Sequence, residues 1–279
     1  LETEFKYVGY QITQDSQDIL LDQQEYIDSV EIIQMSAERE MQKYEALNPA
    51  ELKKYRSMVG SLNWVVQGSR PDLFFQLVDL STRFRSGTVD DLLKVRKILQ
   101  KARDSKSEIC FPDMGPVDGW KIVFYADASH ANLCEGTGSC VGYIVFILGM
   151  NNRCCPLTWK SGKARRVVKS SIAAEAMALL DAIDESLYQK EILCQILSLS
   201  SSNLPIVGMT DNEGLWQAVR STKLVDDRRL RIELAGVKEN LQRGDIREIR
   251  WCCSAEMLAD CLTKKNADGR KLLAVLHSG

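Results

Sequence analysis

Apolar residues follow different spacings in the two parts of the chain. Near the N-terminus, "FKYVGYQITQDSQDILLD" has two short apolar runs around a polar turn, as in a β-hairpin, and residues 26–33 then show helical spacing. From about Pro49 to Lys106 the pattern predicts three helices, and "SRPDL" separates two of them because the residue before a proline disfavours the helical conformation. This first part is therefore predicted to be mainly helical with a small hairpin.

A run of turn residues, "PDMGPVDG" at 112–119, marks a predicted boundary between two domains, 1–115 and 116–279. After it, apolar runs of strand length alternate with helical patterns in the order βββαβααβα. The helix capped by Ser170 or Ser171 is long, and its apolar stripe needs a sheet to cover. The second part is therefore predicted to be of the α/β class, with a mixed five-stranded sheet and helices on both faces.

The composition is that of an ordinary globular protein, with 45% hydrophobic and 27% charged residues. No apolar run approaches the roughly 18 to 20 residues that a membrane span requires, and the N-terminus lacks the layout of a signal peptide. We therefore expect an intracellular protein, cytoplasmic or nuclear, without a membrane partner. The chain begins with Leu1 in what resembles the inside of a fold, so it is expected to be a piece of a longer polypeptide.

Charge is divided unevenly along the chain, although the net charge is only −2. Residues 1–119 contain 15 Lys and Arg against 20 Asp and Glu, whereas residues 120–279 contain 21 against 18. Because like charges repel and opposite charges attract, the second part is the one suited to a polyanionic partner such as a nucleic acid.

The nine cysteines are interpreted as reduced structural thiols. None forms a C-x-x-C pair, and two adjacent pairs of cysteines lie in apolar, strand-like surroundings. His130, Cys134 and Cys140 suggest a zinc site, but a fourth ligand at a suitable spacing is missing. Neither a disulfide framework nor a zinc site is therefore expected.

Four acidic residues occupy positions where a carboxylate suggests chemistry. Asp127 is predicted to end the strand "VFYAD" and Asp211 the strand "IVGMTD"; as parallel neighbours about 4.8 Å apart, both would project where open α/β sheets bind ligands. Glu175 falls on the sheet-facing stripe of the long helix, and Asp260 falls in a predicted closing helix, "AEMLADCLTKK". Taken singly, each acid is more often a turn residue, a cap or a solvated position. Together they predict one acidic cluster.

Such a cluster needs cations, because converging carboxylates repel one another. Oxygen ligands without nearby His or Cys suit hard cations, so Mg²⁺ or Mn²⁺ is the expected cofactor. Two such ions, about 3.5 to 4 Å apart, can activate a water and stabilise the leaving oxygen of a phosphodiester. The acidic residues therefore predict a two-metal nuclease.

Four phrases in a fixed order, "YADAS", "SSIAAEAMAL", "MTDNEGLWQAV" and "GDIREIRWCCSAEMLADCLTK", resemble the ribonuclease H domain of copia-type retrotransposon Pol polyproteins. The flanking phrase "PLTWKSGKARRVVKSSIAAEA" is similar too. Upstream, "YVGYQIT" and "YRSMVGSLNWVVQGSRPDLFFQLVDLS" resemble the thumb or connection segment that joins the reverse transcriptase to this domain. The resemblance covers nearly the whole chain and implies a ribonuclease H-like fold for 116–279.

The resemblance also implies a reaction, the hydrolysis of the RNA strand of an RNA/DNA hybrid to leave a 3′-hydroxyl and a 5′-phosphate. The family's four catalytic and metal-binding positions correspond to Asp127, Glu175, Asp211 and Asp260. Asp127 and Asp211 would contact both ions or one each. Glu175 would hold the ion near the attacking water, and Asp260 would complete the other side. The implied partners are the hybrid and the polymerase part of the same polyprotein.

The chain departs from the family pattern at several positions. A second acid is common two residues before Glu175, where this chain has Ala173, and Asp is common where it has Glu233, a peripheral candidate. The loop "WCCSAEMLAD" lacks the histidine found in cellular and retroviral relatives. Asp226 and Asp227 precede a predicted helix instead of lying in a hairpin, so this chain is not expected to polymerise DNA.

Candidate nucleic-acid contacts surround the acidic cluster. Five cations lie within ten residues before the Glu175 helix: Lys160, Lys163, Arg165, Arg166 and Lys169. A run of charged residues usually lies in a solvated loop, but this one would overhang the acidic cluster and contact the phosphate backbone of a nucleic acid. Ser129, Asn132 and Asn212 are candidates for contacts to 2′-hydroxyls. Trp159 and Trp216 have the rings needed to stack on bases, although core packing is the expected role of both.

Three functions stay open on these grounds. The leading hypothesis is a metal-dependent ribonuclease H. The second is a nucleic-acid-binding or scaffold module derived from such an element, with its catalysis lost, since function belongs to the site and not to the fold. The third is another two-metal nuclease of the same fold, such as an integrase or a resolvase, which needs a different arrangement of the last acid and helix.

Overall fold

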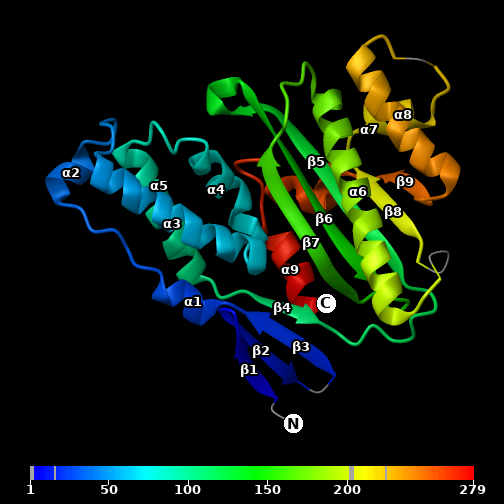
Figure 1. Cartoon of the computed structure of the whole chain (residues 1–279), viewed down its shortest axis with the longest axis horizontal. Coiled ribbons are helices and arrows are strands. Elements are labelled where there is room, and N and C mark those ends of the chain that lie inside the picture. The colour runs from blue at the N-terminus through cyan, green and yellow to red at the C-terminus, as the bar shows by residue number, and fades with distance from the viewer. Residues whose placement is uncertain (1–2, 16, 201–203, 224) are drawn as a thin grey trace.

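The N-terminal unit combines a small sheet with a group of helices (Figure 1). The computed structural model describes residues 3–15, 17–200, 204–223 and 225–279. In chain order this unit contains β1 (Glu4–Tyr7), β2 (Tyr10–Asp15), β3 (Asp18–Asp22), α1 (Gln24–Ser29), α2 (Ala37–Met41), α3 (Pro49–Gly68), the 3₁₀ turn η1 (Pro71–Leu73), α4 (Phe74–Ser81), α5 (Val89–Asp104) and β4 (Glu108–Phe111). The predicted hairpin is β2 and β3, and β1 and β4 extend it to an antiparallel sheet of four strands.

Local sequence signals explain where the long helices of this unit begin and end. At the start of α3, Asn48 and Glu51 each accept a backbone N–H of the other, and Pro49 fills the first helical position. The helix ends at Gly68, and its C-cap Ser69 leaves the helical conformation two residues before Pro71, as the proline predicts. These bonds satisfy backbone groups that a helix end would otherwise leave without partners.

The second unit contains a five-stranded mixed sheet. In chain order its elements are β5 (Lys121–Leu133), η2 (Cys134–Gly136), β6 (Gly138–Leu148), β7 (Cys154–Lys163), α6 (Ser171–Leu197), β8 (Ile206–Thr210), α7 (Glu213–Arg220), α8 (Arg228–Arg243), β9 (Glu248–Trp251), the 3₁₀ turns η4 (Ser254–Glu256) and η5 (Leu258–Leu262), and α9 (Arg270–Ser278). The strand order is β7-β6-β5-β8-β9, with antiparallel pairs on the β6 side of β5 and parallel pairs on the β8 side. The predicted α/β class and sheet are confirmed.

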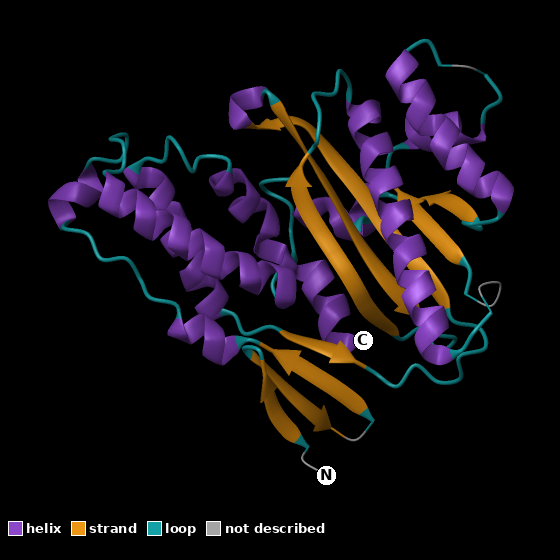
Figure 2. Cartoon of the chain, viewed as in Figure 1, coloured by secondary structure: helices purple, strands orange, loops and turns teal. Residues whose placement is uncertain are grey.

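Helices cover both faces of this sheet (Figure 2). On one face lies α6, with α8 against it. Side chains alternate along β5, so Phe124 and Ala126 enter the core beneath α6, while Tyr125 packs into the core on the opposite face. That opposite face is covered by η5, by α9 and by α4 of the N-terminal unit.

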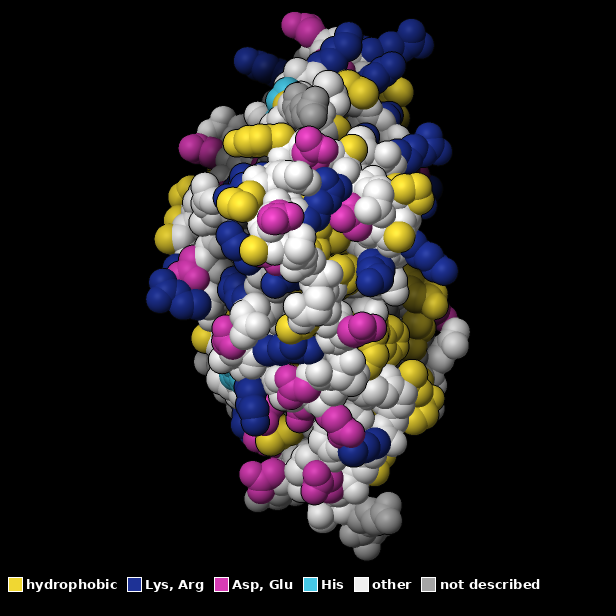
Figure 3. Space-filling view, turned by 90° about the vertical axis from the view of Figure 1, so that its left-hand side faces the viewer, with side chains coloured by type: hydrophobic (Ala, Val, Ile, Leu, Met, Phe, Trp, Pro, Cys, Tyr) yellow, Lys and Arg dark blue, Asp and Glu magenta, His cyan; other side chains and the backbone are white. Residues whose placement is uncertain are grey.

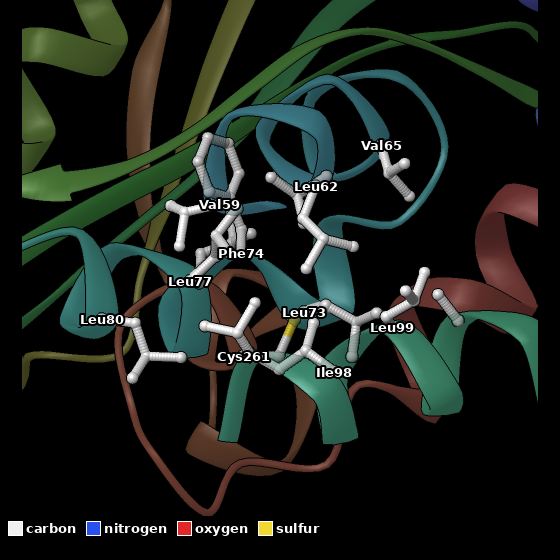
Figure 4. Close-up of a cluster of buried hydrophobic side chains, with 14 of the residues drawn as sticks. Val59, Leu62, Val65, Leu73, Phe74, Leu77, Leu80, Ile98, Leu99 and Cys261 are labelled. Atoms are coloured by element: carbon white, nitrogen blue, oxygen red, sulfur yellow. The ribbon is translucent and has the colours of Figure 1, made fainter. Parts of the chain in front are cut away.

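One hydrophobic core crosses the predicted domain boundary. Val59, Leu62, Phe74, Leu77 and Ile98 from the helices of the N-terminal unit pack together with Cys261 of η5 (Figure 4), and Ile144 and Phe146 of β6 belong to the same cluster. The indole Nε1 of Trp159 on β7 donates a hydrogen bond of 2.8 Å to the carbonyl of Val66 on α3. The helical unit therefore serves as a covering layer of the five-stranded sheet. The division at 115/116 stays a prediction.

Two local predictions are wrong. The strand of Asp127 does not end there, because its antiparallel pairing with β6 continues through Ala128 and Ser129, and only the parallel pairing with β8 stops at Tyr125. The predicted closing helix is a pair of 3₁₀ turns, η4 and η5, because Met257 between them is extended. Among the described residues, no helix is both long and apolar enough to cross a lipid bilayer.

Candidate active site

Three aspartates meet beside the paired strands β5 and β8. Asp127 lies within β5, Asp211 directly follows β8, and Asp260 lies in η5. One carboxylate oxygen from each lies within 4.8 Å of the other two. Asp127 is fully buried, whereas Asp211 and Asp260 are partly exposed. The fold thus gathers three of the four predicted acids at a place that opens to solvent on one side.

The fourth acid, Glu175, lies in the first turns of α6. This helix begins at Ser170, whose hydroxyl accepts the backbone N–H of Ala173, as the sequence predicted. The Glu175 side chain is buried, and its Oε2 has no hydrogen-bond partner among the described residues. Its oxygens lie outside the group of three, but the charges of Asp127 and Asp211 act on it. Glu175 therefore borders the aspartate cluster.

The surroundings of the cluster disfavour the charged form of its carboxyl groups. Burial raises the pKa of Glu175 to about 9, and the neighbouring charges of Asp127 and Asp211 add to this effect. Burial also raises the pKa of Asp127 to about 6, although Lys264 and a hydrogen bond from Thr263 oppose the rise. The pKa of Asp260 is raised as well, again through burial. A cation that binds beside these carboxyl groups stabilises their charged form.

Lys264 and Thr263 complete the cluster, and neither was predicted from the sequence. The Lys264 Nζ lies 2.6 Å from Asp260 Oδ1 and 3.1 Å from Asp127 Oδ1. The Thr263 hydroxyl donates to Asp127 Oδ2. Burial lowers the pKa of Lys264, but the charges of Asp127 and Asp260 outweigh it, so the pKa lies above its ordinary value. A sequence signal existed, because Asp260 and Lys264 are four residues apart.

The residues present fit a divalent hard cation. The donor set consists of carboxylate oxygens, which Mg²⁺ and Mn²⁺ prefer. The buried Glu175 Oε2 has no hydrogen-bond donor among the described residues, and burying a carboxylate oxygen without a partner is costly. Asp211 is oriented by the Ser254 hydroxyl, which donates to its Oδ2 over 2.7 Å. The arrangement can therefore hold and orient such an ion.

Several of the five predicted basic residues are engaged in ion pairs. Lys160 lies 3.4 Å and Arg165 4.0 Å from Asp181 Oδ2 on α6. Arg166 forms an ion pair with Glu233 of α8, so this candidate acid holds the loop and lies outside the aspartate group. Lys163 and Lys169 have no carboxylate within 4.0 Å in the part of the chain that the structure describes. These two are the cations least committed to other partners.

The predicted polar contacts also have structural roles. Ser129 donates its hydroxyl to the carbonyl of Thr263 over 2.7 Å, and Asn212 caps α7 by accepting the backbone N–H of Leu215. Trp159 and Trp216 both donate their indole N–H to backbone carbonyls and pack against the cores, so their predicted core role is confirmed. Whether Ser129 and Asn212 contact a nucleic acid stays a prediction.

The surface of the helical unit differs from that of a uniformly basic nucleic-acid platform. On the face turned toward the viewer in Figure 3, Lys and Arg are interspersed with Asp and Glu. This agrees with the excess of acidic residues in 1–119. The run of five Lys and Arg residues without an intervening acid instead lies on β7 and in the loop that follows it.

The chain matches no protein-family model, but it is similar to transposon proteins. It is 26% identical over 212 residues to a retrovirus-related Pol polyprotein from transposon RE2 of Arabidopsis thaliana, covering 76% of this chain and 14% of that protein. It is 26% identical over 175 residues to a transposon Ty5-1 protein of Saccharomyces cerevisiae, covering 58% of this chain and 54% of that one. It is 31% identical over 138 residues to the secreted RxLR effector protein 161 of Plasmopara viticola, covering 48% and 89%.

Solved ribonuclease H structures resemble the chain weakly. The ribonuclease H1 of Halobacterium salinarum aligns with 51% of this chain and 94% of its own, at 16% identity and a TM-score of 0.37. At a TM-score below 0.5 such an alignment does not establish a shared fold, and the sheet order and strand directions assign the fold here. The chain spans only 14% of the length of the RE2 polyprotein.

Proposed function

We propose that this chain, which belongs to the family of retrotransposon Pol polyproteins, is a ribonuclease H that hydrolyses the RNA strand of RNA/DNA hybrids with two divalent ions. The observation that carries the proposal is the acidic cluster of Asp127, Asp211 and Asp260 with the buried Glu175 beside it. A cluster of this kind destabilises the fold unless cations bind it, so its presence needs a functional reason.

In this reaction the chain's own residues would hold and orient the reacting groups. The ions, when bound, would activate the attacking water and offset the charge on the leaving 3′ oxygen. Asp127 would be the central ligand, because the Thr263 hydroxyl fixes its carboxylate at the floor of the site. Ser254 orients Asp211, and Asp260 would complete the cluster from the side that is open to solvent.

The hybrid would approach over β7 and the basic loop. Lys163 and Lys169 would contact its phosphates, because neither is held by a carboxylate in the described residues. Arg166 would act differently, by fixing the loop to α8 through Glu233. The loop leads directly into α6 and therefore into Glu175, so binding of a phosphate backbone there would bring the strand close to the cluster.

A second candidate function is a nucleic-acid-binding module without catalysis. The match to a secreted effector protein favours it, because the alignment covers 89% of that protein, whose name describes neither a polyprotein nor a nuclease. Such a module would keep the basic residues and lose the need for ions.

A cleavage assay separates the two functions. The purified chain is incubated with an end-labelled RNA/DNA hybrid in Mg²⁺ or Mn²⁺, beside single-stranded RNA, duplex DNA and a chelator control. We expect cleavage of the RNA strand of the hybrid alone, and a loss on the order of 100-fold or more in Asp127→Asn, equivalent to about 2.7 kcal/mol of transition-state stabilisation. Asp118→Asn, which changes an exposed aspartate before β5, is the matched control and should cleave normally. A hybrid that binds and stays intact would establish the second function.

A further inference from the structure

The strongest unexplained feature of the site is the position of Lys264. Its ammonium lies between two of the acids, 2.6 Å from Asp260 Oδ1 and 3.1 Å from Asp127 Oδ1. The side chain is 39% exposed, so one side of it faces solvent while its tip contacts a fully buried carboxylate. Nothing in the proposed reaction yet uses this residue.

The backbone holds Lys264 in this place. The amides of Thr263 and Lys264 both donate to the carbonyl of Asp260, over 3.1 and 2.9 Å. The neighbouring Ser129 and Asn132 of β5 bind the carbonyl of Thr263 from the other side, over 2.7 and 2.8 Å. The lysine is thus attached to a segment tied to β5, and its stem reaches the cluster from a fixed base.

A divalent ion shared by Asp127 and Asp260 would need the place that this ammonium occupies. Mg²⁺ binds carboxylate oxygens at about 2.1 Å and does not share a coordination site with a second cation. Two positive charges a few Å apart also repel each other strongly in a partly buried site. The ion and the ammonium are therefore mutually exclusive at Asp260.

We propose that Lys264 is a tethered cation that competes with one of the two divalent ions, so the site takes up its ions unequally. This inference rests on the proposed function and deepens it. An ion held by Glu175 would displace no cation of the described residues, whereas an ion held by Asp127 and Asp260 would bind only after the ammonium moves out. The flexible four-carbon stem and the exposed side of Lys264 give it a route into solvent.

This competition makes full loading of the site depend on the concentration of divalent ions. At low concentration Lys264 neutralises part of the cluster and the second ion is excluded. At high concentration the divalent ion displaces the ammonium, because it has twice the charge and can be bound by several carboxylate oxygens at once. The lysine would then be free to face the polyanionic strand.

Ion binding tests the inference without any measurement of cleavage. Free Mn²⁺ is followed by electron paramagnetic resonance during titration of the full chain, at fixed pH and salt and without nucleic acid. Lys264→Met, which keeps the length of the stem and removes the charge, is compared with Lys265→Met, which removes the charge of the exposed neighbouring lysine. Lys264→Arg keeps the charge and serves as a third variant.

We expect the wild-type chain to bind one Mn²⁺ more tightly than the second. Lys264→Met should bind the weaker ion on the order of tenfold more tightly, while Lys265→Met and Lys264→Arg should match the wild type. If Lys264→Met does not fold, Lys264→Gln is titrated instead and should show the same tightening. An unchanged isotherm, or an equal gain in Lys265→Met, would overturn the inference. If Lys264→Met binds Mn²⁺ more tightly but the wild-type chain does not cleave the hybrid, the proposed function is rejected and the competition between Lys264 and the ion is supported.

Discussion

Replacing Glu175 by glutamine removes a carboxyl group that must take up a proton when folding buries it. The side chain is 7% exposed, its Oε2 lacks a partner among the described residues, and burial raises its pKa to about 9. Glutamine has nearly the same shape as the protonated acid and no charge. We therefore expect Glu175→Gln to stabilise the chain when no divalent ion is present, although it removes a proposed ligand.

The size of the effect follows from the pKa. An acid whose pKa is higher in the folded chain binds more protons there than in the unfolded chain, so the free energy of unfolding falls as pH rises from about 4.5 to about 9. Each tenfold change in acidity is worth about 1.4 kcal/mol, which gives at most about 5 kcal/mol at pH 8. Asp127 and Asp211 share part of this repulsion, so we expect a gain of about 2 to 4 kcal/mol.

Urea denaturation from pH 5 to pH 9 with a chelator measures the effect. The difference between Glu175→Gln and wild type should be small at pH 5 and grow toward pH 8. Glu191→Gln, an exposed position on the same helix, is the control and should differ from wild type by less than about 0.5 kcal/mol at every pH. Added Mg²⁺ should stabilise the wild type more than the variant, because a ligand that binds only the folded chain raises its stability. A variant that is less stable than wild type at pH 8 with chelator would refute the reasoning.

Three further predictions concern the scaffold around the site. Arg166→Ala should lower the free energy of unfolding, measured in urea, by about 2 kcal/mol, because it leaves the buried Glu233 carboxylate unpaired. The control Arg165→Ala, which changes a side chain that is 77% exposed, should change the free energy of unfolding little. Equal effects of the two substitutions would contradict the role of the Arg166–Glu233 pair. Gly208→Ala should cost about 1 to 3 kcal/mol in thermal unfolding, because the added Cβ would lie 2.3 Å from a phenylalanine ring of β5. A fragment of 116–279 should bind a hydrophobic dye more strongly than the full chain, because it lacks the helices that cover one sheet face, and equal fluorescence would show that this face needs no cover.

Much of the fold was predictable because its signals are local. The caps at Ser170 and Asn212 act over three residues, and each begins its helix where the sequence predicts. The alternation along "WKIVFYAD" separates two faces of β5, and the crossover through α6 makes β5 and β8 parallel neighbours. The position of Asp211 after β8 follows from the same pattern.

Other features of the site depend on contacts between distant segments. The extension of β5 beyond Asp127 results from pairing with β6, and a pattern within one strand does not encode the length of its partner. Glu233 was considered as a peripheral acid, but its partner Arg166 lies 67 positions away and only the packing of α8 brings the two together. The 3₁₀ geometry of η5 likewise arises where the segment is packed against β5 and β6.

The sequence by itself determined the class of fold, the order of helices and strands along the chain and the four acids that suggest metal chemistry, because periodicity, caps and residue type act over a few neighbouring positions. Only the tertiary structure decided which of these acids share one site, that Lys264 and Thr263 stand among them, and that the helical unit covers the sheet. Most of these contacts join residues that are far apart in the chain, and Thr263 and Asp127 are 136 positions apart. Electrostatic and packing energies depend on distance in space, and the chain must fold before that distance exists.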